Sequence, residues 1–302
     1  MDAEYKLARG TQPAMLNATL ELIYPKNTSF TGTFENKDSV LRSIGQIHLE
    51  DETARLVFVY PKENELMQDV CCLIEGLGKR AGEMGAHFLL APTEENNQFH
   101  YALCQCAYRP LFSQKYWQIN LSKRMSANQD YQWRPSTARD LPAIQSFYHT
   151  CLSPAIQTIW PIKPHNYPDT LLVTDGELCG LASLHRFTDT LFIYPLILSS
   201  LPHPEKALVS LIKYSQPSPM VFLVIPSFQS WLEGLQSKLF AETILKQLIL
   251  VKHFTLHQRA IVEVEDRLSI KEHGREPTTS FTPFIPVINI NCFFTPVAWF
   301  VG

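Results

Sequence analysis

The sequence predicts an α+β protein made of two related domains, each with a mixed, mostly antiparallel sheet and flanking helices. The main observation is a repeat in the layout of the chain. One apolar run ends at Pro61, a helical stretch follows, and a second apolar run ends near Pro92; Pro195 and Pro226 mark a similar unit further on. The interval between the two prolines is the same in both units. The offset from Pro61 to Pro195 matches the length of one ordinary domain and far exceeds a solenoid repeat.

In the first copy, the hydrophobic pattern predicts each element in turn. Residues 40–50 alternate between apolar and polar side chains, as in a strand with one buried face, whereas 54–60 are more uniformly apolar, as in a strand buried on both faces. Residues 66–84 carry apolar side chains at helical spacing. The predicted order is helix 13–22, strands 29–35, 40–50 and 54–60, helix 66–84, strand 87–91, helix 96–106 and strand 108–120.

The second copy opens with a helix signal. Asp140 supplies a side-chain acceptor directly before Leu141-Pro142, which predicts a helix start. Further on, Asp175-Gly176 joins two strand-like runs and predicts a hairpin. The predicted order is strands 170–174, 177–186 and 190–197, helix 204–214, strand 220–225, helix 228–238 and a last strand near 245–254. A meander followed by strand, helix, strand and helix is typical of a mixed α+β domain.

The patterns also predict where the domains begin and end. The stretch 122–132 is polar and has no apolar periodicity, as expected of a linker. The predicted segments are an incomplete N-terminal domain at 1–121, the linker at 122–132, a C-terminal domain at 133–262 and a tail at 263–302.

Composition narrows the classes of function. The chain has 302 residues, 45% of them apolar and 18% charged, which is typical of a globular protein with real cores. Its formal charge of −3 shows no excess of Lys and Arg, so we expect no nucleic-acid partner. Seven cysteines without metal-ligand spacing favour reduced thiols and no metal site. Because the N-terminus is polar and no secretory signal is visible, the sequence favours a cytoplasmic protein.

The C-terminal segment 281–302 carries no charged residue, and its length approaches the roughly 20 residues that span a bilayer. Pro283, Pro286 and Pro296 would interrupt any helix there. We therefore expect a docked extended tail or a partner-contacting strand rather than a membrane span. The oligomeric state is left open.

Two stretches of the second copy carry a resemblance to a known family. Arg134-Pro135, followed by Asp140-Leu141-Pro142-Ala143, is similar to the opening strand and helix of the GNAT family of acyl-CoA-dependent N-acetyltransferases. The run 171–180 resembles the second and third strands of that family, and the order of elements resembles the family twice over, across about 5–255. The resemblance implies a splayed pair of parallel strands in each copy, acetyl-CoA as cofactor, and a small-molecule or peptide amine as acceptor.

The resemblance also implies where coenzyme A would bind. In the family, the pantetheine arm pairs with exposed backbone at the end of the fourth strand, and the pyrophosphate lies on the amino end of the next helix. The usual glycines of that loop are missing here in both copies. The first loop, at 61–69, carries three acids, whereas no acid precedes the second helix. The expected cofactor-binding residues are therefore those of the second copy: Leu196, Ile197, Leu198, Ser199, Ser200, His203 and Lys206.

Catalytic residues are not assigned. The tyrosine that often protonates the leaving thiolate in the family is replaced by Leu103 in the first copy and by Leu235 in the second. Neither Glu50 nor Glu177 can be separated from an ordinary surface carboxylate as the general base. Two hypotheses therefore remain open: an N-acetyltransferase with its cofactor in the second copy, or an inactive GNAT-like scaffold that binds coenzyme A or contacts partners.

Overall fold

The computed structural model describes residues 3–4, 7, 28–35, 42–60, 67–95, 98–122, 131–163, 167–187, 189–215 and 219–254. All of them lie in one compact unit, Met1–Phe254. The predicted helix at 13–22, most of the loop at 61–69, most of the linker and the tail at 263–302 fall outside the described residues. Within the described part, no helix is both long and apolar enough to cross a bilayer.

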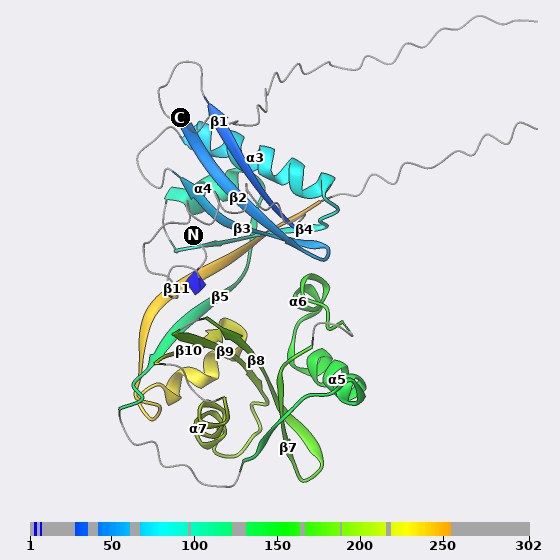
Figure 1. Ribbon diagram of the computed structural model, residues 1–302, viewed down its shortest axis with the longest axis vertical. Coiled ribbons are helices and arrows are strands. Elements are labelled where there is room, and N and C mark those ends of the chain that lie inside the picture. The colour runs from blue at the N-terminus through cyan, green and yellow to red at the C-terminus, as the bar shows by residue number, and fades with distance from the viewer. Residues whose placement is uncertain are drawn as a thin grey trace, which may run out of the picture. The chain divides into compact units, whose positions relative to one another are not determined.

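The described strands form one sheet of eleven, in the order β1-β2-β3-β4-β11-β5-β10-β9-β8-β7-β6 (Figure 1). The first copy supplies β1 (Ser29–Glu35), β2 (Arg42–Glu50), β3 (Thr53–Tyr60), α3 (Met67–Glu83), β4 (Phe88–Thr93), α4 (Gln98–Gln105) and β5 (Arg109–Ile119). The second supplies β6 (Trp133–Pro135), η1 (Ala138–Asp140), α5 (Leu141–Cys151), α6 (Pro154–Ile159), β7 (Thr170–Thr174), β8 (Glu177–Arg186), β9 (Thr190–Ile197), α7 (Pro204–Tyr214), β10 (Met220–Pro226), η2 (Ser227–Leu235) and β11 (Ala241–His253).

The predicted two-copy α+β fold is confirmed. Each copy has an antiparallel meander that ends in one parallel pair, β3 with β4 and β9 with β10. The repeat is less regular than the prolines indicate, however. The first parallel pair opens with Thr53 opposite Phe88, and the second opens with Thr190 opposite Met220. Because Thr53 and Phe88 lie further apart in the sequence than Thr190 and Met220 do, the helical crossover is longer in the first copy.

The two copies exchange their last strands. The strand β11 of the second copy pairs with β4, and β5 of the first copy pairs with β10. At the centre, Gln114 pairs with Gln247 and Lys115 with Lys246. Neither copy completes its sheet with its own strands alone.

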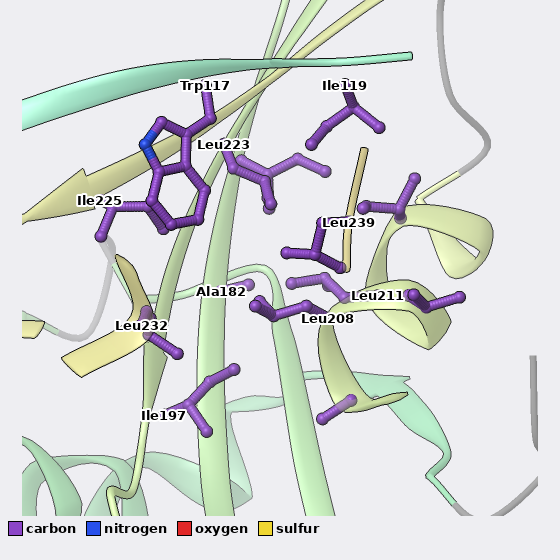
Figure 2. Close-up of a cluster of buried hydrophobic side chains, with 14 of the residues drawn as sticks. Trp117, Ile119, Ala182, Ile197, Leu208, Leu211, Leu223, Ile225, Leu232 and Leu239 are labelled. Carbon is purple, nitrogen blue, oxygen red and sulfur yellow. The ribbon is translucent and has the colours of Figure 1, made fainter. Parts of the chain in front are cut away.

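Alternation along the strands builds a core on each face of the second copy, because successive side chains point to opposite faces. On β7, Leu172 packs in the core with residues of α7 and η2, whereas Leu171 packs with Ile144 and Phe147 of α5. Figure 2 shows the first of these cores, in which Trp117 of β5 joins the second-copy side chains because of the strand exchange. The face that carries Leu171 is the one on which the candidate site lies.

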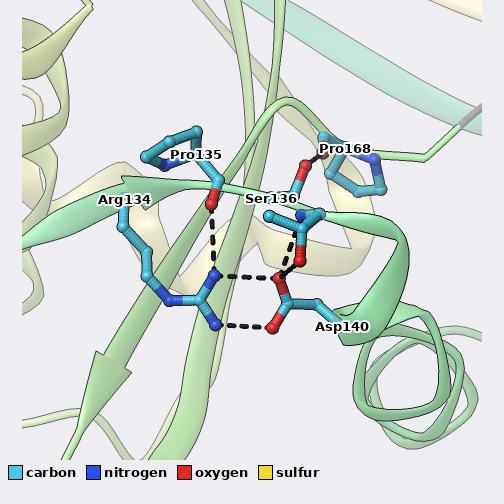
Figure 3. Close-up of polar contacts among 6 residues, drawn as sticks. Arg134, Pro135, Ser136, Asp140 and Pro168 are labelled. Atoms are coloured by element: carbon cyan, nitrogen blue, oxygen red, sulfur yellow. Dashed lines mark hydrogen bonds and ion pairs between the residues drawn. The ribbon is translucent and has the colours of Figure 1, made fainter.

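Asp140 begins α5 as expected, but its side chain makes no capping bond to that helix. Instead, its carboxylate accepts bonds from the Thr137 N–H at 2.9 Å and from the Arg134 guanidinium at 2.6 and 2.9 Å (Figure 3). The Arg134 bonds, with those of Thr137, lower the pKa of Asp140. Asp140 therefore ties β6 to the short η1 turn that precedes the helix.

Two predicted elements differ from the structure. The predicted helix at 228–238 is the 3-10 helix η2, which has non-helical backbone angles at Gln229 (φ −117°, ψ 30°). The last strand starts at Ala241 rather than near 245 because its first residues pair with the end of β5. The short helix α6 is an element that the sequence patterns did not predict.

Packing at Gly45 yields a stability prediction. A Cβ atom at Gly45 would lie 2.7 Å from Leu77 Cδ1 and 3.4 Å from the Phe58 carbonyl oxygen. Because Leu77 is buried in the core, relief of this contact must disturb core packing, and we expect Gly45→Ala to lower the free energy of unfolding by about 1–3 kcal/mol. The control is Gly82→Ala in α3, where no atom lies within 4 Å of the new Cβ and helix propensity predicts a gain of about 0.5–1 kcal/mol. Urea denaturation measures both; equal effects would contradict this packing.

Candidate functional site

The parallel strands of the second copy separate before they end. β9 and β10 are paired from Thr190 and Met220 to Ile193 and Leu223. Beyond that point β9 continues to Ile197, paired only with β8 on its other side. In a strand, the C=O of one residue and the N–H two residues later point the same way, so Pro195 and Ile197 direct a carbonyl and an amide into the gap. The pair β3 and β4 separates likewise after Arg55 and Leu90.

The side chain of Gln229 fills this gap. Its Nε2 donates to the Pro195 carbonyl oxygen at 2.6 Å, and its Oε1 accepts from the Ile197 N–H at 2.9 Å. A glutamine amide carries one acceptor and two donors, so it can replace the peptide group of a neighbouring strand. Gln229 is 3% exposed, and these bonds satisfy a buried carbonyl and a buried amide that would otherwise be costly. The backbone of η2 is non-helical at this same residue.

The amino end of α7 is occupied as well. Pro204 has no N–H to offer a ligand, and the N–H of Lys206 is directed to the His203 carbonyl oxygen at 2.9 Å. The carboxylate of Glu205 lies 3.5 Å from His203 and 3.8 Å from Lys238. Burial acts to raise the pKa of Glu205, but its own backbone N–H, Lys238 and His203 outweigh burial and lower it. An acid of the chain therefore stands where the sequence predicted a place for an anion.

The residues predicted to hold coenzyme A lie along this strand end and loop. Ile197 is buried in the core, and Leu198 is half-buried beside α5. Ser199, Ser200 and His203 are exposed, and Lys206 is half-buried. Leu196 is the member of the predicted set that lines the cavity described next.

A cavity of about 350 Å³ lies on the same face of the sheet as α5. It extends along β5, β8 and β9 and is bounded by α5, α6 and the start of η2. One wall is aromatic: the Phe112 ring lies 5.4 Å from the Trp160 ring and 5.5 Å from the Phe228 ring, centroid to centroid. Trp160 and Phe228 are each 37% exposed. The cavity reaches the gap between β9 and β10, because Tyr194, Pro195 and Gln229 all line it.

One part of the cavity, called the polar end below, holds a buried carboxylate. Glu4, from the start of the chain, is 8% exposed. The Tyr194 hydroxyl donates to one of its carboxylate oxygens, and His185 Nδ1 lies 3.2 Å from the other. Arg55 of β3 also lines the cavity and acts electrostatically on the same carboxylate. Three strands thus direct polar groups towards one acid.

These contacts shift the pKa values of all three partners. Burial acts to raise the pKa of Glu4, but His185, Arg55 and Tyr194 together lower it. Burial acts to lower the pKa of His185, but Glu4 raises it above its usual 6.5. Burial raises the pKa of Tyr194, so its hydroxyl keeps its proton and donates. The polar end therefore favours the ionised form of Glu4 and the protonated form of His185, each relative to the isolated side chain.

Sequence reasoning missed most of this site. Of the two carboxylates considered as bases, Glu50 lines the cavity and Glu177, at the hairpin, does not. Glu4 carries no local signal, since its partners lie 181 and 190 residues away. Gln229 also has no signal, because a glutamine in a helical stretch is ordinary. The separating strands, by contrast, follow from the family resemblance.

Comparisons with known proteins support the fold. No family model and no curated protein matches the chain. A GCN5-related N-acetyltransferase from Kribbella flavida aligns with a TM-score of 0.51 at 12% identity, covering 81% of this chain and 96% of the other. A functionally unknown conserved protein from Staphylococcus epidermidis aligns with a TM-score of 0.52 at 12% identity, covering 74% and 94%. A tandem GNAT protein from the clavulanic acid pathway aligns at 0.48 and 11% identity, covering 81% and 89%.

The chain therefore has the GNAT fold, and its cofactor motifs are degenerate. It has a tandem form of that fold, in which the two copies share one sheet and exchange their last strands. At this identity the comparisons define the fold, while the chemistry depends on the side chains described above.

The pairing of Glu4 with His185 predicts a pH dependence. The lowered pKa of Glu4 contributes stability above its unfolded value of about 4.5, and this is lost as pH falls through the folded pKa. The raised pKa of His185 contributes stability below about 6.5, and this is lost as pH rises through the folded pKa. Between about pH 4.5 and pH 6.5, both groups contribute their full stabilisation. We therefore expect Glu4→Gln to lower the free energy of unfolding most in this range and less at higher pH.

Urea denaturation across pH measures this stability difference, and NMR titration of the His185 ring measures its pKa. Arg55 lowers the pKa of His185 and Asp169 raises it in both proteins, so the comparison isolates Glu4. We expect the pKa of His185 to fall in the variant. An unchanged pKa would show that the pair does not form in solution.

Proposed function

We propose that this protein uses the GNAT fold to bind a small, largely apolar molecule in the cavity that residues of both copies line, with no coenzyme A in the groove beside it. The observation that carries this proposal is the pair of bonds from Gln229 to Pro195 and Ile197. These are the backbone groups that the pantetheine arm would use if the family resemblance held in full. The chain supplies the amide itself.

Energetics support a closed groove. Each of the two hydrogen bonds contributes about 0.5–1.5 kcal/mol, and removal of Gln229 would leave a buried carbonyl and amide without their partner. A coenzyme arm could replace these bonds, so Gln229 alone would weaken binding without abolishing it. The diphosphate adds a second cost, because it would meet the Glu205 carboxylate at a helix end whose first N–H groups are missing or engaged.

The cavity has the properties of a ligand site. Its volume of about 350 Å³ falls within the usual range for small-molecule pockets, about 300–1,000 Å³. Apolar and aromatic side chains form much of its wall, and Glu4, Arg55, His185 and Tyr194 form a polar cluster on it. This division suits a molecule with an apolar body and one polar group.

A second candidate is the transfer of an acetyl group from acetyl-CoA to a small-molecule or peptide amine. One observation favours it: the cavity reaches the separated end of β9, where a thioester would lie in the family. In this case the coenzyme would displace Gln229, and Ser199, Ser200, His203 and Lys206 would contact the phosphates. The fold is common to both candidates.

Titration with acetyl-CoA distinguishes them. We expect no thermal shift of the wild-type protein at millimolar acetyl-CoA, whereas a bound ligand at a hundredfold excess over its Kd would stabilise by about 2.7 kcal/mol. A clear shift that the Ser199→Ala/Ser200→Ala/His203→Ala variant abolishes would refute the closed groove and leave the second candidate, whose acetyl transfer an activity assay would then test.

The role of Gln229 is tested by its replacement. Gln229→Ala should lower the free energy of unfolding by about 1–3 kcal/mol, because two buried backbone groups lose their partner. The matched control is Gln236→Ala, whose amide makes a longer bond of 3.3 Å to the Ala241 carbonyl oxygen; we expect a loss below about 1 kcal/mol. Equal losses in urea denaturation would show that Gln229 does not hold the gap closed.

A further inference from the structure

The polar end of the cavity is built around one carboxylate. Both oxygens of Glu4 are engaged: one by the Tyr194 hydroxyl and the other by His185 Nδ1. These donors come from neighbouring strands, β9 and β8, whose residues Tyr194 and Ser183 are paired in the sheet. The two donors are therefore carried by adjacent strands of the sheet, whereas Glu4 is not part of either strand. Hydrogen bonds to an ionised acceptor are among the strongest that proteins make.

Two positively charged groups act on this carboxylate. Arg55 lines the cavity and lowers the pKa of Glu4 through its charge, and His185 does the same. Glu50 is a further acid on the cavity wall, and Asp169 acts on His185 from the outer side. Without the Glu4 side chain, the polar end would therefore present an arginine, an imidazole and a hydroxyl donor towards the cavity.

Glu4 reaches this place from a segment remote in sequence. Ala3 is fully buried against Tyr116 and Phe192, which places the start of the chain on the cavity face of the sheet. The separations of 181 and 190 residues from its partners show that Glu4 is not part of the local framework that positions them. Glu4 occupies a site formed by other elements.

We propose that Arg55, His185 and Tyr194 form a carboxylate-binding site whose present occupant is the chain's own Glu4, and that the ligand of the cavity is a small monocarboxylate with an apolar or aromatic body. This inference rests on the proposed ligand-binding function and specifies the chemistry of the ligand. The carboxylate of the ligand takes the place of the Glu4 carboxylate, and its body lies along the wall of Phe112, Trp160 and Phe228. An ammonium ligand would instead face Arg55 and His185.

The test is the full chain with Glu4→Ala, titrated by calorimetry with 3-phenylpropionate. The neutral probe 3-phenylpropionamide has the same shape, and 3-phenylpropylamine reverses the charge. We expect Glu4→Ala to bind the carboxylate at least about 10-fold more tightly than the wild type does, because the internal competitor is gone. It should also prefer the carboxylate to both other probes by at least about 10-fold. Adding Tyr194→Phe should reduce carboxylate affinity, while Tyr101→Phe, at an exposed position, should not.

Three results would overturn the proposal. The first is equal or tighter binding of the amide or the amine, which would refute a carboxylate ligand and leave ligand binding in the cavity standing. The second is a folded Glu4→Ala protein that binds no carboxylate. If Glu4→Ala does not fold, the carboxylate but not the amide should restore its circular dichroism, and failure of that rescue is the third. Acetyl-CoA binding by the wild type, measured separately, would refute the proposed function itself.

Discussion

The amide of Gln229 in the gap between β9 and β10 is the interaction on which the rest of this account depends. Parallel strands that separate leave backbone groups that must find partners, because a buried carbonyl or amide without one is costly. The Pro195 carbonyl and the Ile197 N–H are two such groups, and the Gln229 side chain hydrogen-bonds to both. The gap between β9 and β10, which the family resemblance implies to be a cofactor groove, is therefore filled by a buried side chain of this protein.

At two other places, a side chain of this protein also occupies a position suited to a ligand. At the amino end of α7, the carboxylate of Glu205 stands in place of a phosphate. At the polar end of the cavity, the carboxylate of Glu4 is held by groups from β8 and β9. In each case an acid or amide of the chain occupies a position suited to a ligand. The positions differ in one respect: Gln229 and Glu205 belong to the elements they stabilise, whereas Glu4 comes from a distant segment.

Much of the fold could be predicted from the sequence because it is encoded locally. The hairpin at Asp175-Gly176 and the buried strands β9 and β10 follow from turn chemistry and apolar runs. The strand exchange could not be predicted. The hydrophobic pattern along β5 and β11 identifies each as a strand but does not specify which strand lies beside it. Of the residues that the sequence assigned to cofactor binding, Leu196 lines the cavity, and their role in binding stays a prediction. Glu4, His185 and Gln229 depend on contacts across the fold, which no local pattern records.

The most direct test of the central claim is an NMR titration of the wild-type protein with acetyl-CoA. The resonances to follow are the side-chain NH₂ of Gln229 and the backbone amide of Ile197, which report the two ends of one interaction. If Gln229 holds the groove closed, both signals stay unchanged at millimolar acetyl-CoA. A joint, saturable shift of the two signals would show that the coenzyme displaces Gln229 and would contradict the account.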